Sequence, residues 1–199
     1  MRINVKVLFI RFSFLLLVAF MLSSCFLGSI SDFSEKDIRD NENEIYNCSF
    51  EQGEYGINNF PDGWFSLDSK EGEIVWENTV SQDGNKSIKI NGKHDASIIS
   101  EAFNINPAGV YYSRCFAKTK DNLALPVRIS FIAFNKNGKK VGKFSRTTVV
   151  SDKWIPVNIT TGFFNGSAVF GRLVITVKAQ KDYPVWLDNV GNFKVYEIK

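Results

Sequence analysis

Few residues of this chain have the types and the spacing that catalysis requires. The 199-residue sequence contains a single histidine, His94, in the loop-like stretch 91–95, and it has no Gly-x-Ser-x-Gly nucleophile motif. The acidic residues are scattered through turns, and the nearest pair, Glu71 and Glu73, lies in a glycine-containing turn typical of solvated surface. Glycoside hydrolysis needs two carboxylates at a set separation across a groove, and this pattern does not favour it. The sequence therefore predicts a protein that is not an enzyme, with a weak hydrolase or lyase as the least favoured alternative.

Cys25 ends a region that is built like a secretory signal. Segment 1–24 has basic residues near its start, an apolar run over 12–21 and Leu-Ser-Ser directly before the cysteine. The apolar run is too short to be expected to span a bilayer. Leu-Ser-Ser-Cys resembles the lipobox of bacterial lipoproteins, which implies that residues 1–24 are removed and that Cys25 is lipidated. An ordinary signal peptide is the alternative.

The lipobox implies a location as well as an anchor. Several acyl chains on Cys25 would hold the protein stably to a membrane of the bacterial cell envelope. By resemblance to known sorting preferences, Phe26 after the cysteine favours an outer membrane where one exists, and whether the protein faces the periplasm or the surface stays open.

The segment 25–45 is rich in Ser, Asp, Glu and Asn and shows little periodicity, so we expect a flexible tether. The three basic residues before Cys25 account for the whole formal net charge of +3. The mature chain is then neutral. Neutrality gives no electrostatic reason to expect nucleic acid or an anionic membrane surface as a partner.

Cys48 and Cys115 are an even pair in an oxidising compartment, where disulfides persist. Both lie in strand-like runs, and two buried free thiols are the alternative. Because pairing depends on a geometry that the sequence does not show, the disulfide between Cys48 and Cys115 is left open.

From residue 46 onward, short runs rich in Val, Ile, Phe, Tyr and Trp alternate with Gly, Asn, Asp and Pro, which predicts an all-β domain over 46–199. Alternation is clearest over 127–133 and 173–177, where one set of side chains is apolar and the other polar. Asn137-Gly138 predicts a tight hairpin turn with positive φ at both residues. The expected strands are 46–51, 63–68, 73–80, 86–91, 96–105, 109–118, 126–135, 140–150, 154–160, 168–178 and 184–197. About eleven strands without helices must pack as two sheets, so we expect an antiparallel two-sheet β-sandwich.

Three groups of segments resemble the jelly-roll carbohydrate-binding modules of xylanases and cellulases, families four, nine and twenty-two. Residues 47–51 and Phe60-Pro61-Asp62-Gly63-Trp64 are similar to the opening N-x-x-F-E … P-x-G-W. Residues 84–90 and 106–118 are similar to G-x-x-S-L-K-I and P-G-x-x-Y … K, and 185–190 to the closing V-W-x-D-D/N-V. The resemblance covers nearly all of 46–199. It implies a jelly-roll, galactose-binding-domain-like sandwich that binds a polysaccharide or oligosaccharide, in which the first segment lies beside the last strand.

The resemblance also implies a structural calcium ion that links the first and last strands. The matching side chains are Glu51 and Asp188, with backbone oxygens from nearby loops, since calcium takes six to eight oxygen ligands. The alternative is that both are polar residues at strand ends.

A sugar site needs exposed aromatic rings for the flat apolar faces of the sugar and polar side chains for its hydroxyl edges. Tyr112, Arg114 and Phe116 alternate with small residues, so we expect them to point outward from one strand. Trp76 is the second exposed-aromatic candidate.

Phe134 and Arg146, on the two arms of the Asn-Gly hairpin, are weaker candidates, and Trp64 matches a family position that is usually structural. The family also uses loops at one edge of the sandwich. No run of closely spaced Trp and Tyr marks a sugar platform here. The alternative function is therefore an envelope or surface lipoprotein that makes protein–protein contacts, as an adhesin or an assembly component.

Overall fold

The chain is all-β over the residues that the computed structural model describes, which are 33–38, 41–54, 59–67, 74–91, 95–121, 123–178 and 183–198. Residues 34–199 form one compact unit. Within the described ranges there are eleven strands and no helix, so none of these residues forms a helix that could cross a bilayer. The strands are β1 (Trp64–Leu67), β2 (Ile74–Glu77), β3 (Ser87–Ile90), β4 (Ala96–Ser100), β5 (Phe103–Asn104), β6 (Gly109–Thr119), β7 (Leu125–Asn135), β8 (Lys140–Val150), β9 (Ile155–Thr160), β10 (Ala168–Val177) and β11 (Val185–Glu197).

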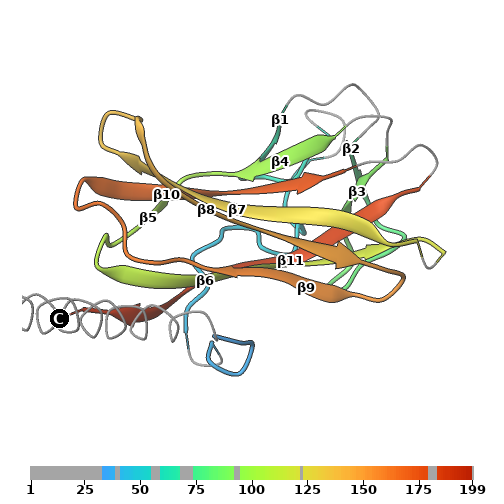
Figure 1. The fold of residues 1–199 in the computed structure, drawn as a ribbon. Coiled ribbons are helices and arrows are strands. Elements are labelled where there is room, and N and C mark those ends of the chain that lie inside the picture. The colour runs from blue at the N-terminus through green and yellow to red at the C-terminus, as the bar shows by residue number, and fades with distance from the viewer. Residues whose placement is uncertain are drawn as a thin grey trace, which may run out of the picture. The chain divides into compact units, whose positions relative to one another are not determined.

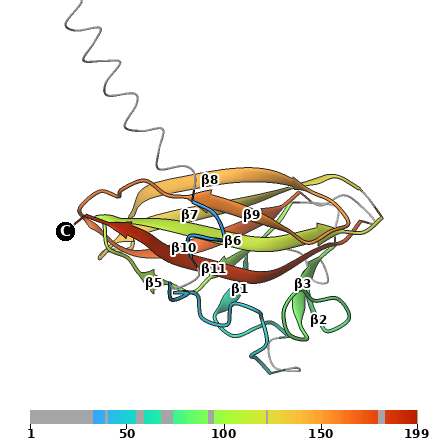
Figure 2. The same ribbon diagram turned by 90° about the horizontal axis from the view of Figure 1, so that it is seen from below.

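Two antiparallel sheets form the sandwich. Sheet A has the strand order β1-β4-β10-β7-β8, with β5 also paired to β10, and sheet B has the order β2-β3-β11-β6-β9. In Figure 1, β10 and β7 of sheet A lie above β6, β9 and β11 of sheet B. In Figure 2 the long strands β11 and β6 run side by side through sheet B. The predicted two-sheet β-sandwich is confirmed.

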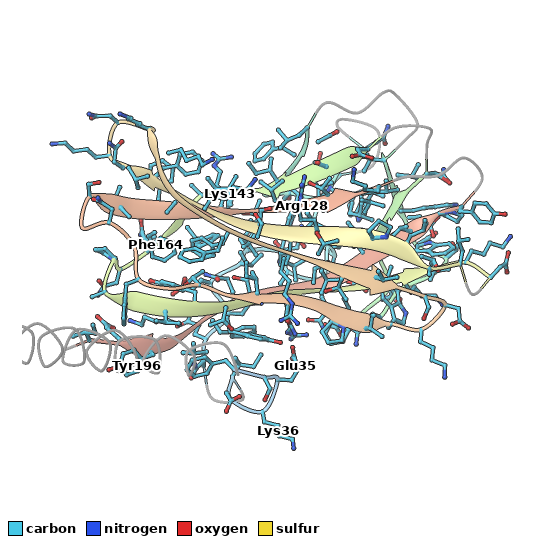
Figure 3. All side chains as sticks on the ribbon, viewed as in Figure 1. Glu35, Lys36, Arg128, Lys143, Phe164 and Tyr196 are labelled. Atoms are coloured by element: carbon cyan, nitrogen blue, oxygen red, sulfur yellow. The ribbon has the colours of Figure 1, made fainter. Side chains whose placement is uncertain are left out.

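The core lies between the two inner faces. Ile129, Phe131, Leu173 and Ile175 of sheet A and Leu187 of sheet B are all fully buried. These are the inward members of the alternating runs, as predicted, and burying each such side chain stabilises the fold by about 1.5–3 kcal/mol. At one end the core is aromatic: the ring of Phe164 lies 5.1 Å from that of Phe131, between the layers in Figure 3.

The hairpin between β7 and β8 is present, but its turn differs from the prediction. The side-chain oxygen of Asn135 accepts hydrogen bonds from the backbone N–H groups of Asn137 and Lys139, both at 3.0 Å. Of the Asn-Gly pair, Gly138 alone has positive φ, at 74°. The Asn135 side chain therefore sets the turn, so Asn137 has no need of the left-handed region.

The prediction of a strand over 46–51 is wrong. These residues form turns, because Asn47 and Phe50 have φ values of 48° and 58°, which a strand cannot contain. The Asn47 side chain holds this shape by donating to the carbonyl of Gln52 at 2.8 Å and accepting from its N–H at 2.9 Å. The segment still lies beside the last strand, as expected, since Val190 donates its N–H to the carbonyl of Cys48 at 2.7 Å. The expected strand 96–105 is divided into β4 and β5.

The described part of the predicted flexible tether is docked on sheet B. Asn192 of β11 is fully buried, and its backbone carbonyl accepts the N–H of Glu44 at 2.9 Å. Its backbone N–H donates to the side-chain oxygen of Asn43, also at 2.9 Å. The Asn192 amide also donates to the Glu44 carboxylate at 3.0 Å, and Ile45 belongs to the core. The sandwich therefore begins before residue 46. Residues 1–32, 39 and 40 lie outside the described residues, and they include the predicted signal and the predicted lipidation site Cys25.

Candidate functional site

The predicted ligand face of β6 is covered by the N-terminal segment. Tyr112, Arg114 and Phe116 share the outer face of sheet B, but Tyr112 is only 1% exposed. Glu35 accepts the Tyr112 hydroxyl at 3.0 Å and pairs with the Arg114 Nε at 3.1 Å. Figure 3 shows Glu35 on the outer side of the lower layer. The outward direction was predicted correctly, and the predicted exposure of Tyr112 was wrong.

The contacts within this face leave little for a ligand. Burial raises the pKa of Tyr112, and the negative charge of Glu35 raises it further, so the phenol stays protonated and donates. The Arg114 guanidinium lies 4.9 Å from the ring centroid of the partly exposed Phe116. The structure thus brings the predicted residues together, but they bind one another and Glu35.

Trp76 is buried and structural, so its prediction as an exposed aromatic is wrong. Its side chain is 4% exposed, and its indole N–H donates to the backbone carbonyl of Phe50 at 2.8 Å. Trp76 pairs with Ile88, whose side chain is fully buried, and residues paired directly across strands share a face. Trp76 therefore lies on the inner face of sheet B, with its indole pointing into the core. Trp64 is also structural, as the resemblance implied, at 3% exposure.

Glu51 and Asp188 hold the two ends of one loop between β2 and β3. The Glu51 carboxylate accepts the backbone N–H groups of Asn85 and Lys86 at 2.8 and 2.7 Å. The Asp188 carboxylate accepts those of Gln82 and Asp83 at 2.6 and 2.9 Å. These hydrogen bonds join the loop to both the opening segment and β11.

The position of Gly84 in that loop requires glycine. Its φ is +66°, and a Cβ atom there would lie 2.5 Å from the Glu51 carboxylate. Asp188 is fully buried, and this burial raises its pKa to about 6, although the backbone N–H groups of Asp83 and Gln82 act to lower it.

The calcium ion stays a prediction that this geometry does not require. Across the described ranges, no group of three or more His, Cys, Asp or Glu side chains could hold a metal ion. Two carboxylates whose oxygens accept backbone N–H groups are a poor fit to a cation that takes six to eight oxygens. The four loop N–H groups connect the same two segments that the calcium ion was expected to link.

Cys48 and Cys115 are free thiols, so the disulfide that the sequence left open is not formed. Cys115 is fully buried, and its Sγ donates to the carbonyl of Asp188 at 3.7 Å. Burial raises the pKa of its thiol, which keeps it protonated. His94 and the pair Glu71 and Glu73 lie outside the described residues.

Sheet A carries a basic outer surface. Its six strands contain five basic residues and, over their described lengths, no acidic residue. Four of the five share a face that we call the basic face: Arg128, Lys140, Lys143 and Arg172. Register fixes this assignment, because Arg172 and Lys143 pair with Ile132 on either side, and Ile132 alternates with buried Phe131 and Ala133. Figure 3 shows Arg128 and Lys143 on the upper layer.

Arg146 is the fifth basic residue and is not part of this face. It pairs with inward-facing Ile129, and its guanidinium donates to the side-chain oxygen of Asn158 on β9 at 3.2 Å. It therefore bridges neighbouring edges of the two sheets.

Aromatic rings lie on the same outer surface as the basic residues. Phe134 and Phe170 pair across β7 and β10, and their rings are stacked with centroids 5.2 Å apart and planes at 14°. Both side chains are partly exposed. The weaker candidate Phe134 therefore has a ring partner that sequence reasoning had not considered.

A second exposed ring, Phe65, marks the β1 edge of this surface. Its side chain is 52% exposed, and residues 60–66 line an open pocket of about 570 Å³ beside it. Phe65 pairs with Ile99, and the same row continues through Val174, Ser130 and Ser145 to the opposite edge. The outer surface of sheet A thus carries rings on β1, β7 and β10 together with hydroxyl and basic side chains.

Sequence reasoning missed Phe65, Phe170 and the grouping of the basic residues. A signal was present, since the alternation over 127–133 and 173–177 assigns Arg128 and Arg172 to the face opposite the core. The register that places Arg172 level with Lys143 is not visible in a single sequence.

Comparison with known proteins connects this geometry to a fold. No family model and no curated protein sequence matches the chain. Among solved structures it is similar to TmCBM61 in complex with β-1,4-galactotriose, with 14% identity and a TM-score of 0.55 over 77% of this chain and 99% of that one. It is similar to a Family 16 Carbohydrate Binding Module-2, with 15% identity and a TM-score of 0.55 over 76% of this chain and 100% of that one.

A third similar structure is the CBM22-1 xylan-binding domain from Paenibacillus barcinonensis Xyn10C, with 16% identity and a TM-score of 0.51 over 75% of this chain and 93% of that one. Two longer chains match over 21% and 27% of their lengths, a bacteriophage CBA120 tailspike protein and an arabinose-bound α-L-arabinofuranosidase. At these identities the likeness concerns the fold. The chain therefore has the β-sandwich fold that carbohydrate-binding modules share.

Proposed function

We propose that this protein is a lipid-anchored, non-catalytic module whose sandwich binds a glycan on the outer surface of sheet A. The observation that carries the proposal is the combination on this one surface of partly exposed rings, Phe65 and the Phe134–Phe170 pair, with hydroxyl and basic side chains. Sugars need both kinds of contact, because each ring of a sugar has apolar C–H faces and polar edges.

The two sheets differ in how open their outer surfaces are. On sheet B the chain's own residues 34–38 and 41–45 cover the middle of the surface through Glu35 and Asn43. On sheet A, Arg128, Lys143 and Ser145 are exposed. The fold similarity supports the same type of ligand, since TmCBM61 was solved with β-1,4-galactotriose and the CBM22-1 domain is described as xylan-binding.

The anchor and the location rest on the sequence. The lipobox-like Leu22-Ser23-Ser24-Cys25 supports removal of residues 1–24 and lipidation at Cys25, which would hold the sandwich to the bacterial cell envelope. Labelling with a radioactive or alkyne-tagged fatty acid tests this directly. The wild-type chain should incorporate the label, and the Cys25→Ser variant should not.

Glycan binding is tested with the mature chain carrying Cys25→Ser, which has no lipid. A glycan array identifies the ligand, and affinity electrophoresis measures the effect of Phe134→Ala and Phe65→Ala. Loss of one ring contact is expected to weaken binding by about tenfold, the equivalent of about 1.4 kcal/mol. Phe163→Ala is the matched control, because Phe163 is 41% exposed but lies outside the strands of sheet A. Equal binding by all variants would contradict the assignment of the surface.

The alternative, a surface for protein contacts, has its own observation. Phe163, Tyr196 and Ile198 are 41%, 53% and 53% exposed, and the rings of Phe163 and Tyr196 lie 6.3 Å apart. Such a cluster is the kind of apolar patch that protein interfaces use. If this function holds, Tyr196→Ser abolishes co-purification of an envelope partner, and the glycan array is negative.

A further inference from the structure

We propose that the glycan is anionic and that the basic face binds its carboxylate or sulfate groups. This inference rests on the proposed function, and it names the class of ligand. The residues that carry it are Arg128, Lys140, Lys143 and Arg172 on β7, β8 and β10.

The neutrality of the mature chain conceals a strong separation of charge. Residues 26–101 contain sixteen acidic and six basic residues, whereas residues 102–199 contain five acidic and fifteen basic ones. Over the continuous stretch 123–178, which supplies β7 to β10, there are nine basic residues and one acidic residue, Asp152. The argument from net charge alone therefore missed the surface on which charge of one sign collects.

The basic side chains of this face are not neutralised by their surroundings. Arg128, Lys140 and Lys143 are exposed, and none of them makes an ion pair with another residue of the described ranges. Lys178, at the end of β10, does pair with Asp95 at 3.2 Å, which shows that a local acid is used where one is present. Arg172 is partly buried and donates one N–H to the carbonyl of Ser100 at 3.3 Å, which fixes the position of its guanidinium.

The spacing of the charges fits a chain of anionic groups better than a single small ion. Arg172 and Lys143 lie on either side of Ile132, so their Cα atoms are two strand spacings apart, on the order of 10 Å. Arg128 lies four residues along β7 from Ile132, a further distance of roughly 13 Å. Each exposed charge contact is weak alone, and a polymer that presents a carboxylate or sulfate at regular intervals engages several of them together.

The surface between the charges has the chemistry of sugar recognition. The stacked Phe134 and Phe170 lie level with Lys140. Two rows further along this face, the exposed hydroxyl of Ser145 donates to the buried hydroxyl of Ser130 at 2.8 Å, so Ser145 is the hydroxyl that a ligand can reach. The two rings pack face to face and are only partly exposed, so they project little beyond the surface. Insertion into a bilayer would instead need apolar side chains that project beyond the surface. These features favour an anionic polysaccharide over an anionic membrane.

The test uses the mature chain with Cys25→Ser and four probes. Polygalacturonate supplies carboxylates, dextran sulfate supplies sulfates, β-1,4-galactan is neutral, and vesicles of phosphatidylglycerol and phosphatidylcholine present an anionic membrane. Isothermal titration calorimetry at low salt should show at least tenfold tighter binding to one of the two anionic polysaccharides than to galactan. Because exposed charges are screened by salt, this preference should decrease as sodium chloride is raised.

Two double variants separate the effect of the basic face from the effect of the protein's overall charge. The double variant Arg128→Gln/Lys143→Gln should weaken binding to the anionic polysaccharide by at least tenfold. The matched control is Lys36→Gln/Lys153→Gln, which removes the same charge from exposed residues outside sheet A and should leave the affinity within about twofold. Circular dichroism confirms that both double variants are folded.

The outcomes distinguish this inference from the proposed function. Tight binding of galactan that Arg128→Gln/Lys143→Gln does not change would overturn the anionic class and leave glycan binding intact. Equal losses in both double variants, or tighter binding to the vesicles than to either polysaccharide, would also overturn it. Failure to bind any polysaccharide or any glycan of the array would remove both proposals together.

Discussion

Asp188 should make the sandwich less stable as the pH rises from about 4 to about 6. Its carboxylate is fully buried, and burial raises its pKa from the ordinary 3.8 to about 6 in the folded state. Between these two values the folded protein binds a proton that the unfolded chain has released. The contribution of Asp188 to the free energy of unfolding is therefore fully present below about pH 4, and it is lost as the pH rises through the folded-state pKa.

The size of the effect follows from the two pKa values. The gap between 3.8 and about 6, at about 1.4 kcal/mol for each pH unit, corresponds to a loss of about 3 kcal/mol. The N–H groups of Gln82 and Asp83 favour the ionised form, and their effect is already contained in the folded-state pKa, so we expect a net loss of about 1–3 kcal/mol. A calcium ion bound between Glu51 and Asp188 would also favour the ionised form and would remove the dependence.

The assay is urea denaturation of the mature Cys25→Ser chain from pH 4 to pH 7.5 in a calcium chelator. Asp188→Asn keeps the shape of the side chain but does not titrate, so the wild-type stability minus that of the variant isolates this one group. That difference should fall by 1–3 kcal/mol with rising pH. Parallel curves for the two proteins would refute the reasoning. A difference that falls in the chelator but stays constant when millimolar calcium replaces it would support the calcium site.

Three further outcomes follow from the corrected positions of the predicted site residues. Trp76→Ala should cost about 3–5 kcal/mol in denaturation, and Trp76→Phe about 1–3 kcal/mol because a buried carbonyl loses its donor, with glycan affinity unchanged in Trp76→Phe. If the folded Trp76→Phe variant binds the glycan more weakly, Trp76 takes part in binding after all. Glu35→Gln should speed hydrogen exchange over 33–38, because Arg114 loses its ionic partner, and unchanged exchange would contradict the contact. Intact-mass analysis without reductant should find Cys48 and Cys115 both reduced, with Cys115 labelled by thiol reagents only on unfolding, whereas a mass lower by two hydrogen atoms would indicate the disulfide.

The fold was largely predictable because alternation reports directly on the core. The runs around Ile129 and Leu173 gave the correct inward faces, since every second side chain of a strand lies on one side. The error at 46–51 arose from the same rule. Tyr46, Cys48 and Phe50 alternate as in a strand, but the side chain of Asn47 binds local backbone groups and holds turns there.

The candidate site was less predictable because exposure depends on distant parts of the chain. Tyr112 was assigned to the correct face, yet it is covered by Glu35, seventy-seven residues away in sequence. A polar segment without periodicity gives no sign that it will dock, because the residues that hold it, such as Arg114 and the buried Asn192, belong to strands far away in the sequence. The basic face likewise depends on strand register, which brings Arg172 level with Lys143 and which composition does not contain.

The hydrogen bonds between Asn43, Glu44 and Asn192 have a mechanical consequence. Any tension that arrives through the N-terminal side of the chain is delivered to β11, a central strand of sheet B that is paired to both β3 and β6. The strands β10, β7 and β8 belong to the other layer and do not form part of this load path. A sandwich pulled by its leading end would thus take up the force first on sheet B, whereas a ligand bound at the surface proposed on sheet A would contact strands of the other layer.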